Sequence, residues 1–118
     1  MNTLYNILAV FLGSGIGGVL RWAVSRYCNG HYQFGTLLVN IAGCFLLGLL
    51  TRMAPGNEHT RLLLMTGLCG GFTTFSTFIT ENLMMMRSGQ FLVSILYIAL
   101  SLVLGITCAW LGFHITLK

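Results

Sequence analysis

Residues 67–78 read GLCGGFTTFSTF, and the interpretation of the whole chain starts from this stretch. It holds three glycines, four hydroxyl side chains and three phenylalanines, and it lies within residues 62–80, which carry no charge. A run this apolar is typical of a membrane span. Its glycines and hydroxyls are not typical of a lipid-facing helix, so we expect something to bind or to pass here.

The composition indicates that the solvent of this protein is mostly lipid. The chain has 118 residues, of which 56% are hydrophobic and only 7% charged, with a mean hydropathy of +0.86. Six Lys and Arg and two Asp and Glu cannot form the polar shell of a soluble domain. The net charge of +4 comes from basic residues scattered singly near helix ends, which excludes a nucleic-acid partner.

Charged residues divide the chain into four apolar stretches, each long enough to cross a bilayer. We therefore predict an all-α membrane protein, with one four-helix transmembrane domain over residues 1–118. No Lys or Arg precedes Arg21 and no small-residue cleavage pattern follows the first stretch, so we expect a retained first helix rather than a signal peptide. The predicted spans are residues 3–26, 34–52, 61–87 (with a break near 70–75) and 91–117.

Two formal motif matches carry no chemistry. The glycines of residues 13–18 match a dinucleotide-binding pattern, but no strand precedes them and no acid follows about twenty residues later. The cysteines show no paired spacing, which argues against zinc and against a disulfide framework. We expect them to be small buried hydrophobic residues. They are Cys28, Cys44, Cys69 and Cys108.

The first stretch combines close packing with a charge. Gly13 and Gly17 lie four residues apart, so a neighbouring backbone can approach that face of the helix. Arg21 follows one turn later, and two interpretations stay open. It either extends to the membrane interface, or it provides a fixed positive charge in an aqueous vestibule, where it would attract anions.

The second stretch has one strongly polar side chain in its interior, Asn40, with Thr36 one turn earlier on the same face. An amide at this depth costs free energy unless it has a partner. Asn40 either bonds a neighbouring helix, as is common in membrane bundles, or points its NH₂ group into a cavity and donates to an anion.

The third stretch is a poor sequence for a continuous helix, because Gly70 and Gly71 are adjacent. A break at membrane depth is tolerated where it lines a cavity, and its free carbonyls can coordinate a cation. Beyond it, phenylalanines alternate with hydroxyls up to Thr80, and the electropositive edge of an aromatic ring can stabilise a small anion. Glu81 then reads as an interfacial carboxylate rather than a proton carrier.

The fourth stretch places Tyr97 and Ser101 one turn apart, with Gly105 one turn further on. These residues form a narrow polar or open strip on an otherwise apolar helix.

The basic residues are balanced between the two sides of the predicted bundle. Arg52, Arg61 and Lys118 fall on one side, and Arg21, Arg26 and Arg87 on the other. Because orientation follows an imbalance of Lys and Arg, this balance predicts insertion in both orientations. An antiparallel two-fold homodimer is then expected.

The stretches GIGGVLRW, GTLLVNIAG and GLCGGFTTFSTF, together with the strip at Tyr97 and Ser101, resemble the Fluc (CrcB) fluoride channels of microorganisms. The resemblance covers all four spans. It implies an antiparallel dual-topology homodimer in the cell inner membrane, with two pores that pass fluoride passively out of the cytoplasm.

The resemblance also implies roles for individual residues. Gly70 and Thr73 would hold a structural Na⁺ at the dimer interface through their backbone carbonyls, and Arg21 and Glu81 match vestibule positions. Gly105 departs from the family, because other members can carry a hydroxyl there. The implied pore residues are Asn40, Phe75, Phe78, Ser76, Thr77, Thr36, Tyr97 and Ser101.

No enzymatic activity is expected, and two other classes compete with a channel. A proton-coupled exporter of the small multidrug-resistance kind needs a membrane carboxylate, which resemblance to that family would place in the first span. That span has no Asp or Glu. A non-transporting assembly subunit leaves Asn40 and the clustered hydroxyls and phenylalanines without a purpose.

Overall fold

The computed structural model describes residues 3–28, 34–53 and 58–115, and every regular element in these ranges is helical. The positions 116–117 of the fourth predicted span, Lys118, and parts of two predicted connections lie outside the described residues. The elements are α1 (Thr3–Cys28), α2 (Phe34–Met53), α3 (Glu58–Thr60), a π-helix η1 (Arg61–Cys69), α4 (Gly70–Phe72), α5 (Phe75–Arg87) and α6 (Phe91–His114).

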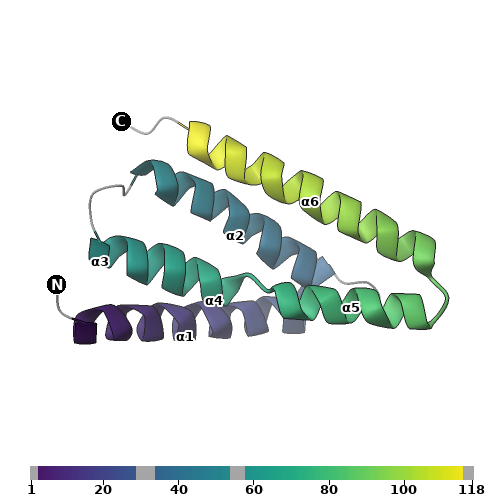
Figure 1. Cartoon of the computed structure of the whole chain (residues 1–118), viewed down its shortest axis with the longest axis horizontal. Helices are drawn as coiled ribbons and strands as arrows, with labels where there is room; N and C mark the ends of the chain where they lie inside the picture. Colours follow the sequence, from purple (N-terminus) through teal and green to yellow (C-terminus); the bar gives the residue numbers. More distant parts are fainter. Residues whose placement is uncertain (1–2, 29–33, 54–57, 116–118) are drawn as a thin grey trace.

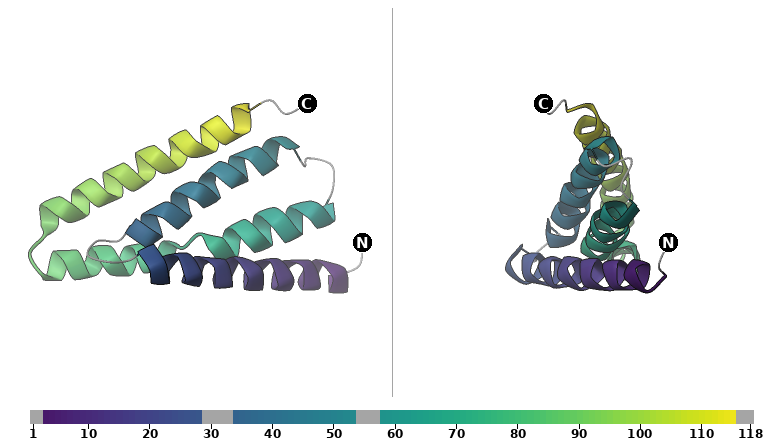
Figure 2. Two further views of the ribbon diagram at one scale, coloured as in Figure 1. Left: turned by 180° about the vertical axis from the view of Figure 1, so that it is seen from behind. Right: turned by 90° about the vertical axis from the view of Figure 1, so that its left-hand side faces the viewer.

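The helices run alternately up and down the long axis of a flat bundle of 51 × 31 × 22 Å. Helix α1 lies along η1 and α4, while α2 packs against α6, and α5 and α6 meet at the far end (Figure 1). The views from behind and from the side in Figure 2 show how thin the bundle is. Each helix therefore has a large face that the chain itself does not cover.

Four helical segments of the described chain are long and apolar enough to cross a membrane. The third combines α3, η1, α4 and α5. This agrees with the prediction of an all-helical protein with four apolar spans. The segments are Thr3–Tyr27, Gly35–Met53, Glu58–Arg87 and Phe91–His114.

Glycines bring α1 into direct backbone contact with the third span, as the spacing of Gly13 and Gly17 predicts. A methyl group on Gly13 would lie 2.8 Å from the nitrogen of Leu68, and one on Gly17 would lie 2.8 Å from the nitrogen of Phe72. The third span contributes its own glycine to the contact, since a methyl on Gly71 would lie 2.9 Å from the Ser14 Cα. No side chain larger than hydrogen fits between these backbones.

Close backbone contacts at glycines also join α2 to α6. A methyl group on Gly48 would lie 2.8 Å from the carbonyl carbon of Ala109, and one on Gly112 would lie 3.0 Å from the nitrogen of Leu49. Close approach of small residues is how helices associate in lipid, where burial of apolar surface gives no driving force.

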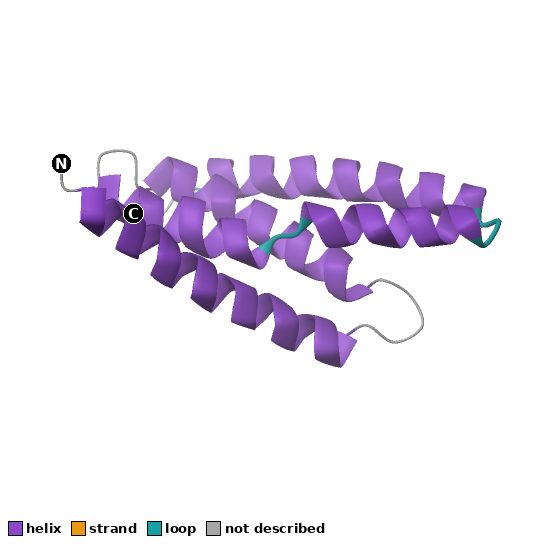
Figure 3. Cartoon of the chain, turned by 60° about the horizontal axis from the view of Figure 1, so that its bottom comes forward, coloured by secondary structure: helices purple, strands orange, loops and turns teal. Residues whose placement is uncertain are grey.

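The third span changes conformation between α4 and α5, where Figure 3 shows a short loop. Gly70 is itself helical, and the extended residues are Thr73 (φ −81°, ψ 158°) and Thr74 (φ −146°, ψ 118°). Thr74 starts the next helix, because its side chain accepts a hydrogen bond from the N–H of Thr77. Threonine is a preferred residue at this N-cap position. The two threonines, rather than the glycine pair, are therefore the extended residues.

The helix before this loop is also unusual. Residues 61–69 form a π-helix of nine residues, a rare conformation that the sequence did not indicate. Its wider turn changes which residues face α1 and α2.

We predict that Gly17→Ala lowers the free energy of unfolding by about 2 kcal/mol, as overpacking does in tight contacts. The new methyl group meets the backbone of Gly71 and Phe72, which cannot rotate away. Thermal unfolding of the purified protein in detergent measures the effect.

Gly15→Ala is the matched control, because a methyl group at Gly15 meets nothing within 4 Å. It should be neutral or slightly stabilising, since alanine favours a helix. Equal stability of the two variants would contradict the close packing of α1 on the third span.

Candidate functional site

A cavity of about 360 Å³ lies where α2, η1, the loop of the third span and α6 meet. None of the described residues that line it carries a formal charge. Six of the twelve residues to which the resemblance gives a pore, vestibule or ion-binding role are among them: Asn40, Gly70, Thr73, Phe75, Phe78 and Ser101. The fold thus brings half of those candidates to one place.

Asn40 holds the loop of the third span. Its Nδ2 donates to the carbonyl oxygen of Thr74 at 3.1 Å, and its Oδ1 accepts from the backbone N–H of Thr74 at 2.7 Å. One amide side chain therefore satisfies both polar groups of an extended residue, as a neighbouring strand would. Of the two interpretations of Asn40, the structure therefore shows the bond to the neighbouring span. Nδ2 has a second hydrogen that neither bond uses.

This pairing changes the hydrogen bonding of two carbonyls. In a continuous α-helix the N–H of Thr74 would donate to Gly70, and the N–H of Thr77 to Thr73. Here Thr74 donates to Asn40, and Thr77 donates to the Thr74 hydroxyl at 3.2 Å. The carbonyls of Gly70 and Thr73 thus lose the donors that a continuous helix would give them.

Arg21 contacts the same part of the third span from the other side. Its Nε donates to the carbonyl oxygen of Gly71 at 3.0 Å, and the side chain is half-buried. A continuous helix would have paired that carbonyl with the N–H of Phe75. Arg21 does not line the cavity. Its position supports neither simple interface anchoring nor, by itself, a vestibule charge.

Three aromatic rings follow one another from the cavity towards α6. The centroids of Phe75 and Phe78 are 6.2 Å apart, and those of Phe78 and Tyr97 are 5.1 Å apart. Phe78 is only 8% exposed, whereas Phe75 is 74% exposed on the single chain. Phe78 is thus fixed by its neighbours, and Phe75 lies at an open edge.

Ser101 supplies an unused polar group. Its Oγ is buried and has no hydrogen-bond partner among the described residues. A buried hydroxyl without a partner costs free energy, so such atoms call for an explanation. Ser101 lines the cavity, where its O–H can donate to a bound anion or water.

Glu81 joins three helices at the end of the aromatic row. Its Oε2 accepts from the hydroxyl of Thr36 at 2.6 Å, and its Oε1 accepts from the hydroxyl of Tyr97 at 2.7 Å. Thr36 is completely buried. The carboxylate is therefore held inside the bundle by α2 and α6, and it is not a free side chain at an interface.

Two further candidates lie elsewhere. Ser76 is exposed, and Thr77 is half-buried with its backbone bound to Thr74. Neither lines the cavity, so the two phenylalanines and the two hydroxyls of this segment face different directions.

A buried polar pair beside this site was not predicted from the sequence. Asn82, which is 4% exposed, donates to the carbonyl of Phe78 at 2.8 Å and accepts from the Ser94 hydroxyl at 2.7 Å. The pair links α5 to α6 and so supports the position of Phe78. An amide inside a predicted span was the signal that could have revealed it.

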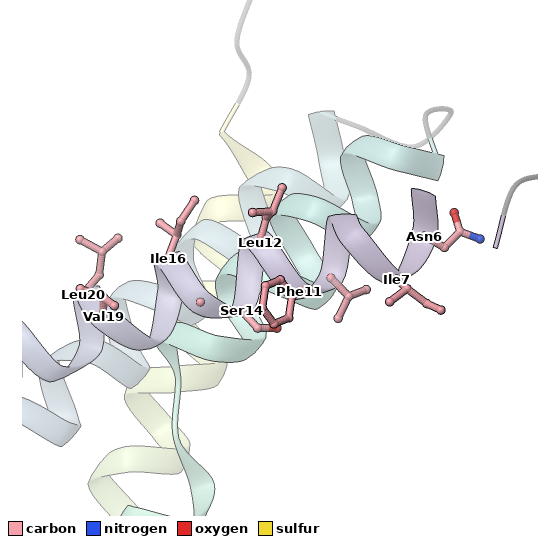
Figure 4. Close-up of a pocket in the computed structure, with 10 residues that line it drawn as sticks. Asn6, Ile7, Phe11, Leu12, Ser14, Ile16, Val19 and Leu20 are labelled. Atoms are coloured by element: carbon pink, nitrogen blue, oxygen red, sulfur yellow. The ribbon is translucent and has the colours of Figure 1, made fainter. Parts of the chain in front are cut away.

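A second, larger hollow of about 1180 Å³ runs along the outer face of α1 (Figure 4). Its lining is apolar apart from Asn6 and Ser14. It offers no group of polar side chains that could bind an ion. Among the described residues, no three His, Cys, Asp or Glu side chains lie close enough to hold a metal.

Comparison with known proteins gives one consistent result. Residues 8–113 match the family described as "CrcB-like protein, Camphor Resistance (CrcB)". The "Fluoride-specific ion channel FluC" of Flavobacterium psychrophilum is 39% identical over 95% of this chain and 94% of that protein. The "Fluoride-specific ion channel FluC 2" of Rhodococcus jostii is 43% identical over 93% of this chain and 97% of that protein. The "Fluoride-specific ion channel FluC" of Phocaeicola vulgatus is 46% identical over 91% of this chain and 94% of that protein.

We predict that Glu81→Gln and Tyr97→Phe each lower the free energy of unfolding by about 2 kcal/mol, the range for hydrogen bonds to a charged group. Glu81→Gln removes the charge to which the Tyr97 hydroxyl donates, and Tyr97→Phe removes that hydroxyl. Because both changes weaken the same bond, the double variant should lose less than the sum of the two. Thermal unfolding of the four proteins measures this coupling.

Tyr5→Phe is the control, since Tyr5 is 61% exposed on α1 and its hydroxyl serves none of these contacts. Strictly additive losses for Glu81→Gln and Tyr97→Phe would show that the bond between them does not form.

Proposed function

Because the chain belongs to the CrcB family, we propose that it is a passive, fluoride-selective ion channel that lets F⁻ leave the cytoplasm. Four apolar helices and this family identify a multi-pass integral membrane protein. A channel of this family is not an enzyme. The observation that carries the proposal is the match over more than nine-tenths of the chain to proteins named as fluoride-specific channels.

The chemistry of the cavity supports this function. Fluoride is small and strongly hydrated, so a pore must replace its water with hydrogen-bond donors. The unpaired hydroxyl of Ser101 and the second amide hydrogen of Asn40 are such donors. The rings of Phe75 and Phe78 can add their electropositive edges.

The absence of formal charge in the described lining also fits conduction rather than tight binding. Lys or Arg beside the path would hold the anion, whereas conduction requires sites that an ion can leave. A passive channel needs no proton-exchanging carboxylate.

We assign the remaining candidates to the approach to this cavity. Thr36 and Tyr97 would act through Glu81, because each donates its single hydroxyl hydrogen to that carboxylate. Ser76 and Thr77 extend the hydroxyl track along α5. Arg21 would add a positive charge on the other side of the third span, which attracts anions to the protein.

The second part of the proposal is an antiparallel homodimer that meets at the loop of the third span, at the middle of the membrane. Irregular backbone at that depth must be covered by protein or line a cavity. Phe75 and Ser76 are exposed on the single chain, and so is Thr80. A second copy would cover this open edge and complete two pathways.

A structural Na⁺ fits at the centre of such a dimer. The N–H groups that would pair with the carbonyls of Gly70 and Thr73 in a continuous helix bond elsewhere, and carbonyls at unwound helices are typical Na⁺ ligands. Two carbonyls from each of two copies would hold the ion. It would supply a positive charge where four helix segments converge.

The competing exporter of the small multidrug-resistance kind is not favoured. Helix α1 contains no Asp or Glu, and the chain belongs to a different family.

For the channel, we predict that liposomes containing only this protein release fluoride rapidly and retain chloride. Phe78→Ile should abolish fluoride release, because it removes a ring that its neighbours fix at the cavity. Phe75→Ile should do the same if the ring edge is used from the open side. A fluoride electrode measures the release.

Phe91→Ile is the control, because Phe91 is 58% exposed at the start of α6 and does not line the cavity. Retention of fluoride by well-folded wild-type protein would refute the channel. Normal release by both Phe75→Ile and Phe78→Ile would refute the aromatic role.

For dual topology, we predict that Glu58→Lys favours one orientation, because it changes the balance of three Lys and Arg on each side to four against three. Carboxy-terminal reporter fusions that are active on only one side of the membrane measure the orientation. The unaltered chain should activate both reporters.

Glu58→Gln is the matched control, since it removes the same acid without adding a basic residue. It should leave both reporters active. A single orientation of the unaltered chain would rule out an antiparallel dimer of this one product.

A further inference from the structure

The lining of the cavity includes three sulfur-bearing side chains, which the proposed channel does not use. Cys44 lies on α2, and Met65 and Cys69 lie on η1, and all three line the cavity. Cys44 and Cys69 are free cysteines. Two thiols and a thioether therefore border one cavity.

The packing explains why all three border this cavity. Met65 and Cys69 both lie on η1 and both line the cavity, and α2 packs against that helix. The thiol of Cys44 lies on the α6 side of the cavity, beside Gly105. A methyl group on Gly105 would lie 3.5 Å from the Sγ of Cys44, which places this thiol at the edge of the open strip on α6.

Sulfur ligands select soft metal ions. Thiolate and thioether groups prefer Cu(I), whereas carboxylate and carbonyl oxygens prefer harder ions. The described lining contains no carboxylate and no imidazole. We therefore propose that Cys44, Met65 and Cys69 form a binding site for a soft monovalent metal ion, of the class of Cu(I) and Ag(I).

The apolar surroundings do not prevent this binding. Each thiol gives up its proton when the metal binds, so affinity increases with pH. Two thiolates and one monovalent ion leave a single negative charge. That charge lies near the unpaired hydroxyl of Ser101, which can donate to it.

Such an ion would also act on transport. The site shares its cavity with Phe75, Phe78 and Ser101. The negatively charged metal complex would therefore obstruct the cavity and repel fluoride. This consequence rests on the proposed channel function. The binding site itself does not.

The test titrates silver nitrate, in chloride-free buffer, into the purified full-length protein carrying Cys28→Ser and Cys108→Ser. This parent keeps only the two cysteines of the cavity. Calorimetry should detect a single silver ion per chain. Cys44→Ser in the parent should weaken binding by about 100-fold, the upper range for loss of even an outer partner of a metal site.

Met65→Leu separates ligation from packing, because it conserves volume but removes the thioether. It should also weaken silver binding while the protein stays folded. A parent that binds no silver, or a parent whose affinity is the same after Cys44→Ser and Cys69→Ser, would overturn the site.

Fluoride release then tests the consequence separately. Silver should slow release through the parent and leave release unchanged in the Cys44→Ser variant, each compared with its own metal-free rate. Silver binding without slower fluoride release would refute the proposal that the bound metal obstructs transport. If no variant conducts fluoride even without metal, the channel proposal fails, while the titration still decides the site.

Discussion

Asn40 bonds both the N–H and the C=O of Thr74, and the architecture of the third span depends on this pairing. In lipid an extended residue has no water to satisfy its backbone, and each unpaired group costs several kcal/mol. A single amide on the adjacent helix removes that cost for Thr74. Arg21 does the same for the carbonyl of Gly71. Asn40 and Arg21 therefore satisfy the backbone of Thr74 and the carbonyl of Gly71 inside an apolar bundle.

The glycine contacts make these bonds possible. Arg21 reaches Gly71 because Gly17, one turn earlier on α1, lets the two backbones touch. Gly43, one turn after Asn40 on α2, leaves space for the methyl group of Thr73 and the ring of Phe72. Small residues thus determine where the backbones approach, and the polar side chains beside them reach across the short distance. The polar bonds therefore depend on the close packing at the glycines.

Much of the fold follows from local sequence. Spans of about 20 apolar residues must be helical in a membrane, and the spacing of Gly13 and Gly17 reveals a contact face. The sequence also drew attention to Asn40, Phe78 and Ser101, because polar or aromatic groups are informative when their surroundings are apolar. The cavity collects residues of this kind.

Other features depend on contacts that no local pattern contains. The adjacent glycines remain helical, and the extended residues are Thr73 and Thr74, because Asn40 captures the backbone of Thr74 from 34 positions away. The partner of Arg21 is 50 positions away. The π-helix and the pair of Asn82 with Ser94 likewise need the packed bundle. Local sequence predicts an interfacial Glu81, since its two donors lie on other helices and no local pattern shows them.

The order of these partners along the chain has a consequence for biosynthesis. Both side chains that satisfy the loop, Asn40 and Arg21, precede it in sequence. When a chain enters the membrane from its amino terminus, α1 and α2 are available before Thr74 emerges. The third span can therefore assume its interrupted form as it inserts, on a template that is already complete.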